Sequence, residues 1–145
     1  MVMYSFQLEN FETWLAGLAD RLNVPVNDRV LTVPDHLGNG TILAQNINPH
    51  LSYAVMNFKL DSDLEFHRET GAAGFIISFN MVEVQKELQV GHHQHIVSDK
   101  RPFRNDIFLT DARDSTSVRI AAGSNVRRLL IYCSHELAAQ YLPHD

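Results

Sequence analysis

The spacing of hydrophobic residues predicts an amphipathic helix near the start of the chain. Between residues 10 and 22, large apolar side chains recur every three or four positions, which places them on one helical face. Asn10 stands where a helix N-cap is expected, and Glu12 lies in the first turn, where the helix dipole favours an acidic side chain. Asn23 and Pro25 end the pattern. The apolar face consists of Phe11, Trp14, Leu15, Leu18 and Leu22.

After this helix the pattern changes to short β-type runs separated by turn residues. Residues 29–33 stop at Pro34, and the Gly-Asn-Gly at residues 38–40 indicates a turn before the next run. Residues 75–83 form the clearest strand, because every second side chain there is large and apolar. About eight strands at intervals of roughly ten residues favour a barrel or a sandwich. The other runs lie at residues 41–47, 51–60, 64–69, 87–90, 106–109, 116–121 and 126–132.

A second, shorter helix is predicted at the end of the chain. Ser134 is placed to cap it, Leu137 and Tyr141 lie one turn apart, and Pro143 ends it. The two apolar side chains either pack on the strands or help two copies associate, and the sequence favours neither interpretation. We therefore expect a single domain over residues 1–145. Its parts are a helix at about 10–22, a barrel at about 29–133 and a helix at about 134–142.

Composition narrows the classes of function. The 145 residues carry 12 basic and 17 acidic side chains, a net charge of −5, which argues against a nucleic acid as the direct partner of this segment. Cys133 is the only cysteine, so an internal disulfide is excluded. No stretch resembles a signal peptide, and no apolar run approaches the roughly 20 residues that cross a bilayer. These features predict a cytoplasmic location.

Several motifs, in this order and spacing, resemble the N-terminal sensor domains of AraC-family bacterial transcription regulators. The strand that ends at Pro34 leads into a Leu-Gly-x-Gly turn at residues 37–40, and a Leu-Ser follows His50, where the family often has glycine. An Ile-Ser-Phe strand lies at residues 77–79. The closing turn, strand and first linker helix of the family are similar to residues 120–137.

This resemblance implies a mainly β, cupin-like double-stranded β-helix barrel that binds a small-molecule effector. It further implies a helix that supports a homodimer, and a downstream pair of helix-turn-helix motifs that is absent from this chain, through which alone DNA would be contacted. The expected protein is a regulator rather than an enzyme, with no cofactor. A stand-alone small-molecule-binding protein without a role on DNA is a further possibility.

Candidate effector-binding residues are those expected on the barrel interior. An apolar stripe on the strand at 75–83 either forms the core or lines a ligand cavity, since a barrel of about eight strands is just wide enough for packed side chains or one small ligand. Polar-tipped residues on neighbouring strands would orient that ligand. The candidates are Tyr53, Asn57, Phe75, Ile77, Phe79, Met81 and Tyr132.

A histidine-rich segment offers an alternative with enzymatic chemistry. His93 and His95 share a face if the segment is extended, and Asp99 follows four residues later. Two imidazoles and a carboxylate suit Zn²⁺, Mn²⁺ or Fe²⁺, as in metal-dependent cupin isomerases and dioxygenases. The glycines and the later histidine of the cupin metal motif are missing here, so we favour a solvated hairpin turn.

Three further positions have two interpretations each. His67 alternates with apolar neighbours, which predicts that it faces solvent rather than a ligand. Of Arg127 and Arg128, one faces inward by alternation and then needs a carboxylate from the protein or a ligand, unless a bulge or the barrel rim leaves both in water. Cys133 is expected to be buried and inert.

Overall fold

The computed structural model describes residues 1–83, 88–92, 95–99 and 103–141, and within residues 82–106 it describes the strand backbone without side chains. None of the described helices is long and apolar enough to cross a membrane. The elements, in chain order, are β1 (Val2–Gln7), α1 (Phe11–Leu22), β2 (Val26–Asn27), β3 (Val30–Thr32), β4 (Gly38–Asn48), β5 (Leu51–Leu60), β6 (Leu64–Glu69), β7 (Gly74–Glu83), β8 (Leu88–His92), β9 (His95–Asp99), β10 (Phe103–Asp111), β11 (Thr116–Ile120), β12 (Asn125–Ser134) and α2 (His135–Tyr141).

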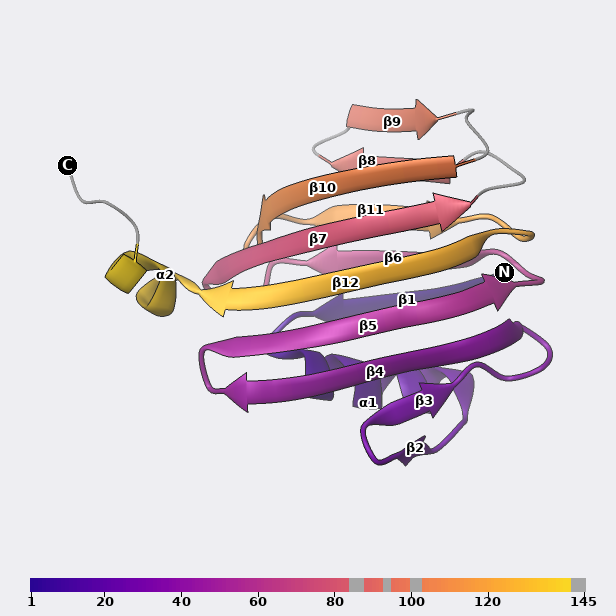
Figure 1. Ribbon diagram of the computed structural model, residues 1–145, viewed down its shortest axis with the longest axis horizontal. Helices are drawn as coiled ribbons and strands as arrows, with labels where there is room; N and C mark the ends of the chain where they lie inside the picture. Colours follow the sequence, from indigo (N-terminus) through magenta and orange to yellow (C-terminus); the bar gives the residue numbers. More distant parts are fainter. Residues whose placement is uncertain (84–87, 93–94, 100–102, 142–145) are drawn as a thin grey trace.

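The strands form two sheets that face each other (Figure 1). One has the order β10-β7-β12-β5-β4-β3-β2 and the other the order β1-β6-β11-β8-β9. From β5 to β12 the chain passes back and forth between the sheets, so that β5, β7, β10 and β12 lie in one and β6, β8, β9 and β11 in the other. This is the jelly-roll topology of cupins. The predicted mainly β, cupin-like fold is confirmed.

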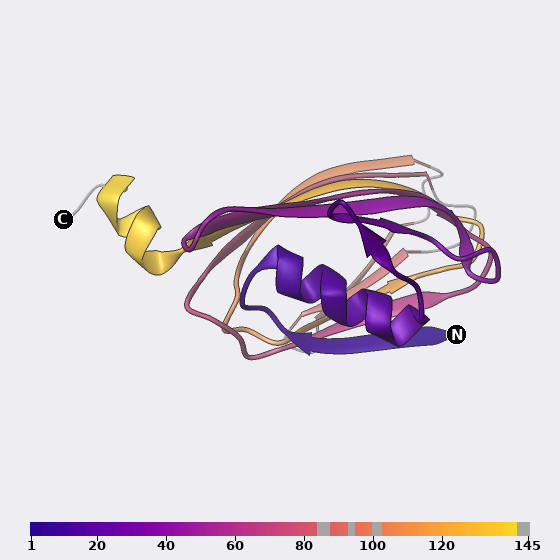
Figure 2. The ribbon, with the colours of Figure 1, turned by 90° about the horizontal axis from the view of Figure 1, so that it is seen from below.

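Helix α1 fills one half of the space between the sheets. Asn10 caps it as predicted, because its side-chain oxygen accepts a hydrogen bond from the Thr13 amide at 2.8 Å, and Asn23 ends it in the left-handed conformation with φ 58°. The helix packs against β1 and β4, and Figure 2 shows it between β1 and the seven-stranded sheet. All the apolar side chains of its predicted face are buried.

Aromatic side chains make this half of the interior dry and closely packed. Trp14 lies with its ring centroid 5.7 Å from that of Phe11 and 5.8 Å from that of Phe66. Tyr4 donates a hydrogen bond to the Trp14 carbonyl at 2.9 Å. Burial raises the pKa of Tyr4 to about 12, and the Asp20 carboxylate adds to the shift. No room for a ligand is expected on this side.

The strand boundaries differ from the prediction at several points. The expected turn at residues 38–40 is the start of β4, where Gly40 has φ +118° and an added Cβ would collide with the Phe58 backbone on β5. Glycine at this position therefore allows β4 to pair closely with β5, and it does not form a turn. Strands β1 and β9 were not predicted, and β1 pairs in parallel with β6, a partner far away in sequence.

Helix α2 leaves the end of β12 and points away from the sheets (Figure 2). The predicted cap is confirmed, since the Ser134 hydroxyl accepts a hydrogen bond from the Leu137 amide at 3.0 Å. No residue of α2 is buried, and Tyr141 is 80% exposed. Tyr141 therefore does not pack on its own strands, whereas Leu137 is partly buried; the role of both residues in a dimer stays a prediction.

Candidate functional site

Most of the residues predicted to line the barrel interior lie on the other side of the sheet. In β5, β7 and β12 the even-numbered side chains point between the two sheets and the odd-numbered ones point outward. We call these the inner and outer faces of the seven-stranded sheet. Only Tyr132 of the candidates is on the inner face, where it is buried and donates a hydrogen bond to the Ala73 carbonyl at 3.2 Å. The outer face holds Tyr53, Asn57, Phe75, Ile77, Phe79 and Met81.

The error has a physical reason. Strand β7 has apolar residues on both faces, so alternation alone does not say which face is inside. Its inner face carries Ile76, Ser78 and Asn80, and two of these three are polar. The sequence reasoning assigned the more apolar face to the interior. As ligand contacts, the seven candidates remain untested predictions.

Arg128 lies on the inner face of β12, whereas Arg127 faces solvent, as alternation predicts. The Arg128 side chain as a whole is half-buried, but its Nε atom has no contact with solvent and no hydrogen-bond partner. Its Nη2 atom lies 3.4 Å from the Ser78 hydroxyl. No carboxylate pairs with this guanidinium among the side chains that the structure describes.

Among the side chains that the structure describes, the charge that acts on Arg128 is the positive one of Arg68. Burial and, as a smaller cause, the positive charge of Arg68 together lower the pKa of Arg128 to about 10. Asn80 is directly opposite Arg128 in the pairing of β7 and β12, and its side-chain oxygen is also buried without a partner. An unsatisfied donor and an unsatisfied acceptor thus lie on the same inner face.

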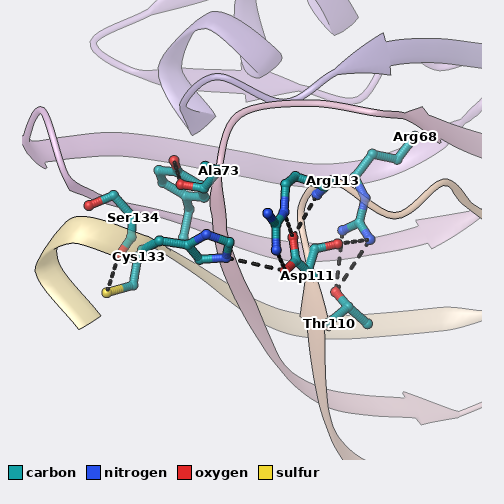
Figure 3. A network of polar contacts seen from close by, with 9 residues as sticks. Arg68, Ala73, Thr110, Asp111, Arg113, Cys133 and Ser134 are labelled. Carbon is teal, nitrogen blue, oxygen red and sulfur yellow. Dashed lines mark hydrogen bonds and ion pairs between the residues drawn. The ribbon is translucent and has the colours of Figure 1, made fainter. Parts of the chain in front are cut away.

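The second interior guanidinium belongs to Arg68, on the inner face of β6 in the opposite sheet. Its Nε donates to the Asp114 carbonyl at 3.2 Å. Its Nη2 donates to the Asp111 carbonyl at 3.3 Å, and both Nη atoms lie 3.4 Å from the Thr110 hydroxyl (Figure 3). Burial lowers the pKa of Arg68, partly offset by the carboxylates of Asp114 and Asp111. Arg68 therefore holds the turn after β10 from inside.

The Asp111 carboxylate connects this turn to helix α2. It accepts hydrogen bonds from Arg113 Nη2 at 2.8 Å and Arg113 Nε at 3.1 Å, and its Oδ2 lies 3.2 Å from His135 Nε2 (Figure 3). These hydrogen bonds from Arg113 hold the pKa of Asp111 well below its usual range. His135 also stacks on Phe75, with ring centroids 4.6 Å apart. The first residue of α2 is thus fixed to the ends of β7 and β10.

The other candidates give no catalytic constellation among the described side chains. His93 lies outside the described residues, as do the side chains of His95 and Asp99. The backbones of β8 and β9 pair antiparallel with His92 opposite His95, and both interpretations of the histidines stay predictions. No three described histidine, cysteine or acidic side chains are grouped to hold a metal.

Two single residues behave largely as expected. His67 faces away from the interior and its Nδ1 lies 2.7 Å from the Ser117 hydroxyl on β11, so the outward prediction is confirmed. Cys133 is half-buried rather than fully buried, and partial burial raises the pKa of its thiol, which opposes nucleophilic reactivity.

The outer face of the seven-stranded sheet has a shallow open groove of about 800 Å³. It brings together three of the predicted ligand residues, Asn57, Phe79 and Met81, with Val55 and Leu129. Both Arg127 and Arg128 are among the residues that line it, although only the Arg127 side chain points to this face, and Ile107 of β10 forms one wall.

Sequence reasoning missed Arg68, Ser78, Asn80 and Thr110. A signal for the first was available, because Arg68 continues the inward series of Leu64 and Phe66 on β6. Ser78 and Asn80 alternate with the apolar stripe that was assigned to the interior, so they were not considered as site residues.

No family model and no curated protein matches this chain. Among solved structures, a cupin protein described as RmlC-like from Desulfovibrio desulfuricans is similar, with 11% identity, 72% of this chain and 88% of that chain covered, and a TM-score of 0.45. An HTH_3 family transcriptional regulator from Vibrio cholerae has 10% identity, coverage of 84% and 71%, and a TM-score of 0.47. The hydroxypropylphosphonic acid epoxidase of S. wedmorenis has 14% identity, coverage of 76% and 59%, and a TM-score of 0.43. Since a regulator and an enzyme both occur among such distant likenesses, they say nothing about activity.

Proposed function

We propose that this chain is the sensor domain of an AraC-type transcription regulator and binds a small anion between its two sheets. The observation that carries the proposal is the Arg128 guanidinium, which faces the interior with an unpartnered Nε and no described carboxylate. The resemblance of the sequence motifs to AraC-type sensor domains supports the regulatory role. Contact with DNA would belong to a segment outside residues 1–145.

Electrostatics explain why an anion is the expected ligand. A charge removed from water without a partner is unfavourable by several kcal/mol, and an opposite charge in the same low-dielectric space offsets this cost. The planar fork of arginine matches the two oxygens of a carboxylate or a phosphate. Arg68, on the facing sheet, adds positive potential to the same interior, as its effect on the pKa of Arg128 indicates.

Asn80 and Ser78 define the rest of the ligand. The free side-chain oxygen of Asn80 requires a hydrogen-bond donor, and the Ser78 hydroxyl donates or accepts. A small molecule that carries a carboxylate or phosphate together with a hydroxyl or amino group satisfies all of these atoms. It must be small, because α1 and its aromatic neighbours occupy the other half of the interior.

The polar contacts described above suggest how binding would be transmitted. Arg68 donates a hydrogen bond to the Asp111 carbonyl, the Asp111 carboxylate lies 3.2 Å from His135 Nε2, and His135 begins α2. An anion that draws Arg68 or Arg128 toward itself changes the balance of these contacts. Binding would then favour one orientation of α2 over another, which is the differential affinity that any switch requires.

Calorimetric titration of the purified protein tests the proposal. The probes are hydroxycarboxylates, amino acids and sugar phosphates, each compared with a neutral analogue such as the corresponding amide or unphosphorylated sugar. At least one anion should bind and raise the melting temperature, whereas its neutral analogue should not. Binding of neutral analogues with the same affinity as the anions would overturn the role of Arg128.

A further inference from the structure

The outer face of the seven-stranded sheet is apolar where an antiparallel sheet that faces water is normally polar. Its most exposed side chains, Ile107 and Leu109 on the edge strand β10, are 71% and 67% exposed. Phe79 and Met81 on β7 and Val55 on β5 are also exposed. Between and beside them lie the half-exposed side chains of Leu43, Phe75, Ile77, Leu129 and Ile131.

These side chains belong to five adjacent strands, from β10 to β4, and therefore form one continuous patch. With the exposures given above, the patch presents on the order of 700 Å² of apolar surface, near the roughly 800 Å² that each partner gives to a standard interface. A typical monomer has a largest apolar patch of only roughly 300–600 Å². The area is thus sufficient for a stable dimer.

The shape of this face fits a second copy of itself. Ile107 and Leu109 are largely exposed on β10 and together form what we call the Ile107–Leu109 ridge; Ile107 is also one wall of the groove of about 800 Å³ that Val55, Phe79 and Leu129 line. A two-fold axis places the same surface of both copies in contact, so that the ridge of each copy meets the groove of the other. The Ile107–Leu109 ridge and the groove lie on the same face, so two copies related by a two-fold axis would each fill the groove of the other.

Polar side chains of the outer face lie at the border of the groove, where an interface keeps its polar residues in contact with water. Arg127 and Asn57 border the groove and are exposed. In an interface they would form part of a polar rim around the apolar centre, where charges keep contact with water. Helix α2 does not cover the patch, because it extends beyond the end of β12.

We propose that two copies of this chain associate through the outer faces of their seven-stranded sheets, with the Ile107–Leu109 ridge of each in the groove of the other. This places the dimer contact on β10, β7, β12 and β5 rather than on α2. It does not depend on the anion site, which lies on the opposite face of the same sheet.

Sedimentation equilibrium of the purified chain over a range of concentrations tests the proposal. The wild type should be a dimer, and the double variant Ile107→Lys/Leu109→Lys should be a monomer with an unchanged circular dichroism spectrum. The matched control is Leu137→Lys/Tyr141→Lys on α2, which should stay dimeric. Should the ridge variant not fold, Val55→Lys, on the far side of the groove, replaces it with the same expectation.

Two results would overturn the proposal. One is a wild-type chain that stays monomeric at about 100 µM, a concentration at which even a micromolar dimer is fully formed; the patch would then belong to another partner. The other is dissociation by the α2 variant and not by the ridge variant. Anion binding measured on the monomeric ridge variant separates a failure here from a failure of the proposed sensor function.

Discussion

Each face of the seven-stranded sheet departs from the usual distribution of polarity at a few positions. The inner face holds Arg128 and Asn80 with unpartnered polar atoms, while the outer face exposes Ile107 and Leu109 to solvent. A protein that acts alone normally buries such apolar groups and pairs such polar ones. Each departure therefore supports one of the two proposals: the inner face binds a small anion, and the outer face binds a second copy of the chain.

Adjacent residues along one strand allow this comparison to be tested in matched pairs, because they share the backbone but belong to opposite faces. The largest effect is expected at Met56 and Val55 of β5, which are 1% and 39% exposed. Met56→Ala should lower the free energy of unfolding by about 2–5 kcal/mol through loss of burial and formation of a cavity. Val55→Ala should lower it by less than about 1 kcal/mol.

Urea denaturation at low protein concentration, where association contributes nothing, measures both values. Equal losses for the two variants would mean that the outer face is as buried as the inner one, and the distinction between the faces would be lost.

The pair Ser52 and Tyr53 should show a smaller difference. The buried Ser52 hydroxyl accepts a hydrogen bond from the Phe11 amide at 3.1 Å, and so ties the first turn of α1 to β5. Ser52→Ala leaves that amide without a partner and should lower the free energy of unfolding by about 1–2 kcal/mol. Tyr53→Phe removes only a hydrogen bond to Gln45 on the outer face and should cost less than about 1 kcal/mol. Thermal melts of both variants show which one loses more stability. A larger drop in melting temperature for Tyr53→Phe than for Ser52→Ala would contradict the prediction.

The smallest expected effect is that of pH at Asp111. Its pKa is depressed in the folded state, so the folded protein holds fewer protons on it than the unfolded chain does, and its stabilising contribution exists above the ordinary aspartate pKa of about 4 and declines below that value. Because the group is near the surface, solvent screens the contribution. Asp111→Asn should therefore be less stable than the wild type at pH 7, with a smaller difference at pH 3. Urea midpoints at both pH values measure this, and a constant difference would exclude the ionised carboxylate as its source.

The parts of the fold that depend on local signals were predictable from sequence. The cap and apolar face of α1, the cap of α2, and the opposite orientations of Arg127 and Arg128 follow from spacing and alternation, although alternation did not say which arginine is inside. The parallel pairing of β1 with β6 did not follow, because it depends on contacts between distant segments.

The candidate site was harder to predict because β7 has two partly apolar faces. Alternation separates Phe75, Ile77 and Phe79 from Ile76 and Ser78, but which set is buried depends on where the other sheet and α1 lie. The more hydrophobic set proved to be outside. From the sequence, the apolar stripe on β7 was assigned to the core. In the structure it lies on the outer face, where it supports the proposed protein interface.

The central claim is that Arg128 is kept in the interior to bind an anion, and the pair Arg128→Met and Arg127→Met tests it most directly. Calorimetric unfolding and anion titration should be measured on both variants and on the wild type. We predict that Arg128→Met stabilises the unliganded protein by about 1–2 kcal/mol, since it removes an interior charge that has no carboxylate partner among the described side chains, and lowers anion affinity at least about 30-fold. Arg127→Met should change neither quantity. A destabilised Arg128→Met variant that binds the anion as tightly as the wild type would contradict the claim.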